Sequence, residues 1–245
     1  MIYPILLSVF SFLSAGLSSC HDKKAEEQTS PRILVFYKTG GYYHQSIPDG
    51  IRAIQTLGEE NRFAVDTTKN AGAFSSSNLK KYDAVVFLNT THEVLDDQQQ
   101  NAFEQYIRSG KGFVGVHAAT DTEYEWPWFN KLVGAYFTNH PKVQEAKILV
   151  KDKNHPSTSH LPSVWVHIDE WYNFKNINPD IKVLAWLDEK SYEGGQNGDQ
   201  HPIAWYHEFD GGRAFYTGLG HTSESYREPM FLKHLLGGIV YAIGK

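Results

Sequence analysis

RILVFYKTGG, residues 32–41, is a run of mostly apolar side chains that ends in two glycines. An apolar run without alternation predicts a strand buried on both faces, and the glycines permit a tight turn after it. Ser46 can cap a helix that follows, with Pro48 in its first turn and apolar residues at helical spacing up to Gly58. This stretch therefore predicts the first strand, turn and helix of an α/β domain.

The same alternation continues through the first half of the chain. Further strands are predicted at residues 63–67, 82–89 and 112–116, and a helix begins at Asp96 and ends at Gly110. Strands that alternate with helices require right-handed crossovers, which place helices on both faces of a parallel sheet. The sequence therefore predicts a flavodoxin-like three-layer α/β sandwich.

The second half of the chain has a different pattern. Polar loops separate its apolar runs, and a helix at 231–243 closes the chain. We interpret the runs as later, partly antiparallel strands of the same sheet, at residues 143–150, 164–172, 183–187, 202–209 and 214–219. The prediction is one domain, residues 32–245, with a mostly parallel sheet and some antiparallel strands in its second half.

Histidines follow several of the predicted strands. His44, Thr90 and His117 each lie just past a strand end, where ligands gather in parallel sheets. His140 and His221 lie in turns marked by proline or glycine, positions where a scaffold fixes a side chain that solvent still reaches. The alternative is that each histidine only bonds a loop carbonyl.

Two carboxylates are the candidates for acid and base chemistry. Asp121 follows His117 by four residues, so one helical turn would stack them and let the carboxylate orient the imidazole. Asp121 as an N-cap of the helix through Trp128 is the structural alternative. Glu170 lies in the run Asp169 to Tyr172, where strand alternation sends Glu170 and Tyr172 to one face. The candidate catalytic residues are His44, His117, Asp121 and Glu170.

The composition favours a small polar ligand. Aromatic residues make up 14% of the chain, and rings beside polar groups often line sugar sites. The candidates for substrate binding are Tyr43, Thr90, Trp126, His140, Tyr172 and His221. A divalent transition metal is a possible cofactor, with His44, His117, His140 and His221 as candidate ligands, although no HExxH motif is present. A net charge of -5 without a basic cluster disfavours nucleic acid, and no phosphate-binding glycine fingerprint follows the first strand.

The N-terminus indicates export. Residues 1–19 are an apolar run with small residues before Cys20, the only cysteine of the chain. They resemble a bacterial signal peptide that is cleaved before a lipidated Cys20, and residues 20–31 form a polar tether. An uncleaved anchor or a different start codon is the alternative, because no Lys or Arg precedes the apolar run. We therefore expect a lipid-anchored protein of the bacterial cell envelope that contacts the membrane through its lipid only.

Several motifs together resemble the ThuA-like, or trehalose-utilisation, family. They span 32–245 and include the segments 38–47, 115–121, 128–134, 140–141, 169–172 and 218–222. The resemblance implies a fold of the class I glutamine amidotransferase-like superfamily and a link to disaccharide catabolism through 3-keto-sugars, and members are often labelled glycosyl hydrolases. Amidotransferases of that superfamily carry a cysteine after the strand where His117 stands here, so we do not expect glutamine hydrolysis.

Two functions fit these residues. The first is an enzyme that acts on a glycoside or 3-keto-glycoside by hydrolysis, elimination or isomerisation, with His117, held by Asp121, as the base. Asp121 and Glu170 are then the pair to test as the two carboxylates of a glycosidase. The second is a non-catalytic carbohydrate-binding lipoprotein.

Overall fold

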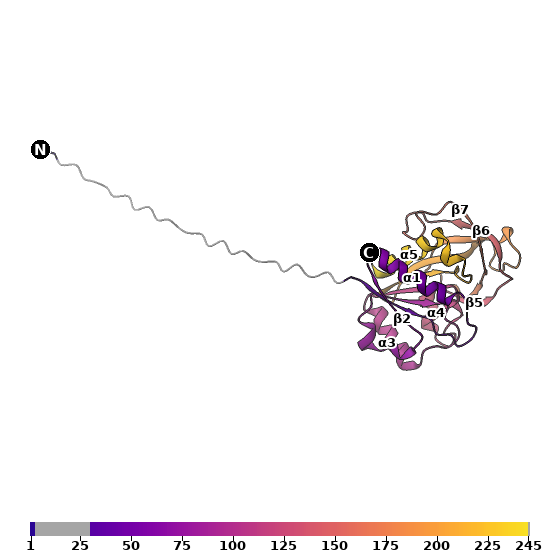
Figure 1. Cartoon of the computed structure of the whole chain (residues 1–245), viewed down its shortest axis with the longest axis horizontal. Coiled ribbons are helices and arrows are strands. Elements are labelled where there is room, and N and C mark those ends of the chain that lie inside the picture. Colours follow the sequence, from indigo (N-terminus) through magenta and orange to yellow (C-terminus); the bar gives the residue numbers. More distant parts are fainter. Residues whose placement is uncertain (3–29, 245) are drawn as a thin grey trace.

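In the part of the chain that the structure describes, residues 1–2 and 30–244 of a computed structural model, nine strands form one sheet (Figure 1). Their order is β2-β1-β3-β4-β11-β10-β9-β6-β7. The strands of this sheet are β1 (Arg32–Phe36), β2 (Ala64–Thr68), β3 (Ala84–Leu88), β4 (Gly112–Val116), β6 (Gln144–Val150), β7 (Val164–Asp169), β9 (Lys182–Asp188), β10 (His201–Phe209) and β11 (Gly212–Thr217). Strands β2, β1, β3, β4 and β11 pair in parallel, and the others pair antiparallel.

Helices cover both faces of the sheet. They are α1 (Ile47–Asn61), α2 (Ser76–Leu79), α3 (Asp97–Arg108), α4 (Pro127–Val133) and α5 (Pro229–Ile243). Helix α5 packs on β4 and β11 and touches α1, whereas α3 and α4 contact β11 from the other side. The predicted three-layer α/β sandwich with a mixed sheet is confirmed.

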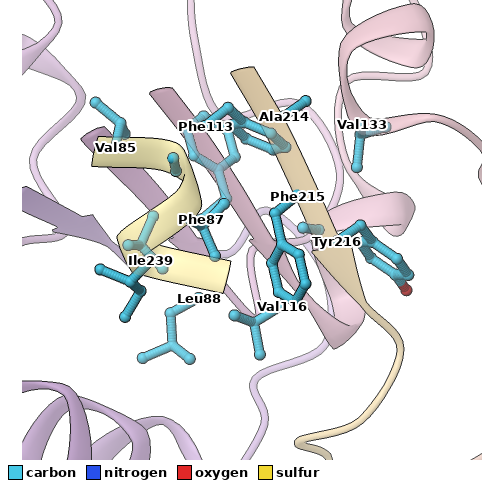
Figure 2. Close-up of a cluster of buried hydrophobic side chains, with 14 of the residues drawn as sticks. Val85, Phe87, Leu88, Phe113, Val116, Val133, Ala214, Phe215, Tyr216 and Ile239 are labelled. Atoms are coloured by element: carbon cyan, nitrogen blue, oxygen red, sulfur yellow. The ribbon is translucent and has the colours of Figure 1, made fainter. Parts of the chain in front are cut away.

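The core follows from the apolar strands. Every residue of β3 and β4 is buried, as expected for strands covered on both faces. Figure 2 shows the two layers of this core: Phe215 and Ile239 lie on the α5 side of the sheet, and Phe87 and Phe113 lie on the opposite side. Phe87 stacks on Phe103 of α3 there.

Most predicted boundaries hold, with local differences. Helix α1 runs past Gly58 to Asn61, and Ser46 stands at its N-cap position without capping it, because its hydroxyl donates to the carbonyl of Gly220 instead. Asp96 does cap α3, in a capping box with Gln99. Asp121 is not an N-cap of α4, which begins after Trp126.

One small element was not predicted. Strands β5 (Tyr136–Asn139) and β8 (Asn173–Lys175) form a separate antiparallel pair. This pair carries Phe137 and leads into His140, so it brings residues to the carboxyl edge that their place in the sequence did not suggest.

The predicted signal peptide, the lipidated Cys20 and most of the tether lie outside the described residues. None of the helices in the described ranges has the length and apolarity needed to cross a bilayer.

Candidate functional site

His117 stands at the centre of the site, directly after β4. Its backbone has a φ of +48° and opens a turn of 3-10 helix, His117–Asp121. A residue with a Cβ adopts this left-handed conformation at a cost of about 1–3 kcal/mol, so such turns are commonly kept for function. The ring is fully buried, and its Nδ1 lies 2.9 Å from the carbonyl oxygen of Gly218. Because a carbonyl only accepts, Nδ1 donates its proton to it, and Nε2 is the ring nitrogen that faces Glu170 and His221.

His44 reaches the same place from the loop between β1 and α1. Its ring centroid lies 4.9 Å from that of His117 and 5.1 Å from that of His221. Burial, together with these two imidazoles, lowers the pKa of His44 to about 2, so the ring is neutral at physiological pH. Its Nδ1 is buried and has no hydrogen-bond partner, which is a costly state for a polar atom that binds nothing.

Glu170 joins three histidines. One carboxylate oxygen, Oε2, lies 3.1 Å from Nδ1 of His221 and 3.5 Å from Nε2 of His117. The other, Oε1, lies 3.0 Å from Nδ1 of His140. Burial alone would raise the pKa of Glu170, but the hydrogen bonds and charges of His117 and His221 outweigh it and hold the pKa well below its usual range. The carboxylate is therefore ionised, and the pKa of His221 is in turn raised by Glu170 against the effect of burial.

These side chains fit a transition metal. One ligand atom each from His44, His117, Glu170 and His221 lies within 4.8 Å of all the others. His117 Nε2 and His221 Nδ1 are 3.2 Å apart, close to the roughly 3.4 Å that separates two ligands of a tetrahedral zinc ion with bonds of about 2.0–2.1 Å. Metal ligands in proteins are usually oriented by hydrogen bonds to further groups. Here the Nδ1–H of His117 donates to the carbonyl of Gly218, and Nδ1 of His140 lies 3.0 Å from Glu170 Oε1. His44, whose buried Nδ1 has no hydrogen-bond partner, is one of the four residues of this cluster.

A pocket of about 310 Å³ opens beside this cluster. Aromatic rings form one part of its wall, and neither Lys nor Arg is among its lining residues, which are Tyr42, His44, Asp121, Phe137, His140, Glu170, Tyr172 and His221. Tyr172 packs between His117 and Phe137, with its centroid 4.2 Å from each. Such rings suit the C–H faces of a sugar, while the imidazoles and carboxylates suit its hydroxyls.

The pKa of Asp121 is shifted in the opposite direction from that of Glu170. Burial raises the pKa of Asp121, and the hydrogen bond from Tyr124 Oη to its Oδ1 offsets this only in part. Two carboxyl groups in one pocket therefore have pKa values pushed in opposite directions, the arrangement that assigns separate proton-donor and proton-acceptor roles.

The structure brings together seven of the ten residues expected at the site: His44, His117, Asp121, His140, Glu170, Tyr172 and His221. It does not pair Asp121 with His117 as predicted. Asp121 bonds Tyr124, and the carbonyl of Gly218 orients the imidazole instead.

Three expected residues lie elsewhere. Trp126 is a core side chain that stacks on Trp128 and donates its indole N–H to Glu104. Thr90 is buried, and its hydroxyl bonds Thr122 at 2.8 Å. Tyr43 is 45% exposed and does not line the pocket. A strand-end position thus did not by itself put a side chain into the pocket.

Two residues that line the pocket were missed. Tyr42, not Tyr43, packs against His44, with centroids 4.8 Å apart. Phe137 belongs to β5, the strand that was not predicted. The run Tyr136-Phe137-Thr138, residue types that are frequent in strands, was the available signal before His140, but four residues are too few to settle a strand.

Comparison with known proteins agrees with this architecture. The family model described as ThuA, trehalose utilisation, matches residues 32–242. The crystal structure of a ThuA-like protein from Bacteroides uniformis is 25% identical, has a TM-score of 0.76 and covers 91% of this chain and 96% of that one. A ThuA-like protein from Parabacteroides merdae is 21% identical, with a TM-score of 0.73 and coverage of 88% and 90%. No curated protein matches the sequence.

A more distant structure shares the fold alone. A GMP synthase protein from Thermoplasma acidophilum is 14% identical, has a TM-score of 0.52 and covers 86% of this chain and 96% of that one. The fold is therefore that of class I glutamine amidotransferase-like domains, and in this chain the residue after β4 is His117.

Proposed function

The chain belongs to the ThuA family, described as trehalose utilisation, and we propose that it is an enzyme that processes an uncharged sugar in the pocket beside His117. The substrate class is a glycoside or 3-keto-glycoside, and the reaction is hydrolysis or elimination. The observation that carries this proposal is the convergence of three imidazoles and an ionised carboxylate on one aromatic-walled pocket. We further propose that the protein works in the bacterial cell envelope, anchored through Cys20.

The pocket's own residues supply binding and proton transfer. Tyr42, Phe137 and Tyr172 cover the apolar faces of a sugar ring. Asp121, whose pKa burial raises, donates a proton to the leaving oxygen. An anionic sugar is disfavoured, because two carboxylates and no Lys or Arg line the pocket.

His44, His117, Glu170 and His221 would hold a divalent transition metal. When bound, such an ion acts as a Lewis acid towards a carbonyl oxygen or a water molecule. Nδ1 of His140 lies 3.0 Å from Glu170 Oε1 and 2.8 Å from the carbonyl oxygen of Pro141, and the backbone of Gly218 holds His117.

Turnover of a panel of glycosides and 3-keto-glycosides by the mature domain tests the proposal. We expect turnover by the wild type and a loss of at least about 100-fold in Asp121→Asn, because general acid catalysis typically contributes 10²–10⁴-fold. A loss is also expected in His117→Ala, because that change removes one of the residues that would hold the metal. Tyr43→Phe, which changes an exposed neighbour of the pocket, is the matched control and keeps full activity.

Binding distinguishes the alternative function. If calorimetry shows that the wild type binds these sugars and the turnover assay finds no product, the protein is a non-catalytic carbohydrate-binding protein. Elemental analysis of the purified protein is expected to find one transition metal per chain, lost in His44→Ala. If the wild type still turns over keto-glycosides after complete removal of metal, the metal has no role in catalysis, but the proposed activity on sugars stands.

A further inference from the structure

We propose that Asp169 is a positioning residue that fixes the turn Gly218 to His221 and thereby sets the rings of both His117 and His221. The inference deepens the function proposed above, because it names a group that shapes the site without lining the pocket. Asp169 is the last residue of β7 and directly precedes Glu170.

The carboxylate of Asp169 is fully buried and bonded on both oxygens. Its Oδ2 accepts from the backbone N–H of Gly220 at 2.8 Å and from the hydroxyl of Ser225 at 3.0 Å. Its Oδ1 accepts from the N–H of His221 at 3.1 Å and from the N–H of Glu170 at 3.0 Å. Three of these four donors are backbone groups, so the carboxylate ties one segment of main chain to another.

The turn that it holds requires glycine at position 220. Gly220 has a φ of +112°, and a Cβ there would lie 2.7 Å from the hydroxyl of Tyr226. While Asp169 accepts from the N–H of Gly220, the carbonyl of Gly220 accepts from Ser46 at 3.0 Å and from Asn89 at 3.2 Å. The Gly220 residue is therefore clamped from both sides, by residues far apart in the sequence.

The turn Gly218 to His221 determines the position of two of the clustered imidazoles. The carbonyl of Gly218 accepts from Nδ1 of His117, and His221 at the other end of the turn presents its Nδ1 to Glu170. A shift of the turn therefore moves His117 and His221 together. Because Asp169 is joined to Glu170 through the chain, it couples the carboxylate of the cluster to both rings.

Asp169 also contacts His167, which in turn contacts Glu228. His167 lies with Nε2 3.4 Å from Asp169 Oδ2 and Nδ1 2.6 Å from Glu228 Oε2, at the rim of an open concavity of about 430 Å³. Ser225 is 3.1 Å from His167 Nε2, so Ser225, His167 and Glu228 follow one another as in a nucleophilic triad. The Ser225 hydroxyl is buried, however, and donates to Asp169, which makes it part of the support for the carboxylate.

Long-range ¹H–¹⁵N spectra of the imidazoles in metal-free protein test the inference. In Asp169→Asn, whose amide N–H₂ cannot accept from the turn, we expect the signals of His117 and His221 to shift, while those of the distant His155 and His234 stay unchanged. The affinity for Zn²⁺, measured by competition with a chelator, should fall 10–100-fold, as for other residues that orient metal ligands. Ser225→Ala removes one of the four donors to Asp169 and leaves the turn bonded, so the changes in its signals and affinity should be smaller than those of Asp169→Asn.

Ser46→Ala provides an independent variant if Asp169→Asn does not fold. It removes one of the two donors to the carbonyl of Gly220, leaves that of Asn89 and does not touch Asp169, and the same two histidine signals should shift. Unchanged His117 and His221 signals in both variants would overturn the inference, as would covalent labelling of Ser225 by a fluorophosphonate, which would make it a nucleophile. These spectra need neither a metal nor a substrate, so they remain decisive even if the proposed function fails.

Discussion

At the scale of single residues, His117 combines a buried ring with a strained backbone. Its φ of +48° places the ring at the edge of the sheet, where a strand continuing in extended conformation would have turned it into the core. The strain is tolerated because Gly218, Tyr216 and the turn after β4 hold the segment: Tyr216 Oη donates to the carbonyl of His117 at 2.7 Å.

A pair of variants measures this strain. His117→Gly and His117→Ala both remove the ring, but only Ala keeps a Cβ in the left-handed region. We expect His117→Gly to be the more stable of the two by about 1 kcal/mol in urea unfolding, the reverse of their order in a helix or strand. Equal stability, or a more stable Ala variant, would show that the turn relaxes once the ring is gone.

At the scale of elements, α3 is fixed at its start. The side chain of Asp96 accepts from the N–H of Gln99 at 2.9 Å, and the side chain of Gln99 accepts from the N–H of Asp96 at 3.1 Å. This capping box satisfies two groups that the helix would otherwise leave unpaired. Helix α3 matters to the core because Phe103 stacks there on Phe87.

Removal of the cap is expected to weaken the whole domain. Asp96→Ala should lower the free energy of unfolding by about 1 kcal/mol, a typical value for a lost N-cap. Gln98→Ala, an exposed change in the first turn of the same helix, should stay within about 0.5 kcal/mol of wild type. Chemical denaturation at pH 7 measures both, and an equal loss in the two variants would contradict a specific role for the cap.

At the scale of the whole molecule, buried histidines link stability to pH. Burial lowers the pKa of His234 to about 3 and that of His155 to about 4. His234 belongs to α5 and packs on Phe215, whereas His155 packs against Tyr241 of the same helix, and each has a buried Nε2 without a hydrogen-bond partner. In the unfolded chain the same groups titrate near 6.5, so below that pH the unfolded state binds more protons than the folded one.

Stability is therefore expected to be complete above pH 6.5 and to fall as the pH decreases from 6.5 towards 4. Each neutral buried histidine contributes a slope of about 1.4 kcal/mol per pH unit in that window. Urea unfolding at several pH values should show a shallower loss for His234→Gln than for wild type, with His160→Gln, outside the core, as the control. If the free energy of unfolding falls with pH as steeply in His234→Gln as in wild type, then His234 does not contribute to this pH dependence.

The sequence by itself determined the succession along the chain of the nine strands of the main sheet and of α1, α3, α4 and α5, and the gathering of His44 and His117 at one edge, because periodicity and turn residues act locally and parallel strands share their carboxyl edge. Only the tertiary structure decided which side chains meet there. In the sheet β10, β9 and β6 separate β7 from β11, yet Asp169 at the end of β7 bonds the turn after β11, so the antiparallel half of the sheet curls back over the edge. That curl brings Glu170 to His117, and β5 paired with β8 brings Phe137, while Trp126 turns into the core. Contacts of this kind depend on pairing between distant segments, on which local residue patterns carry no information.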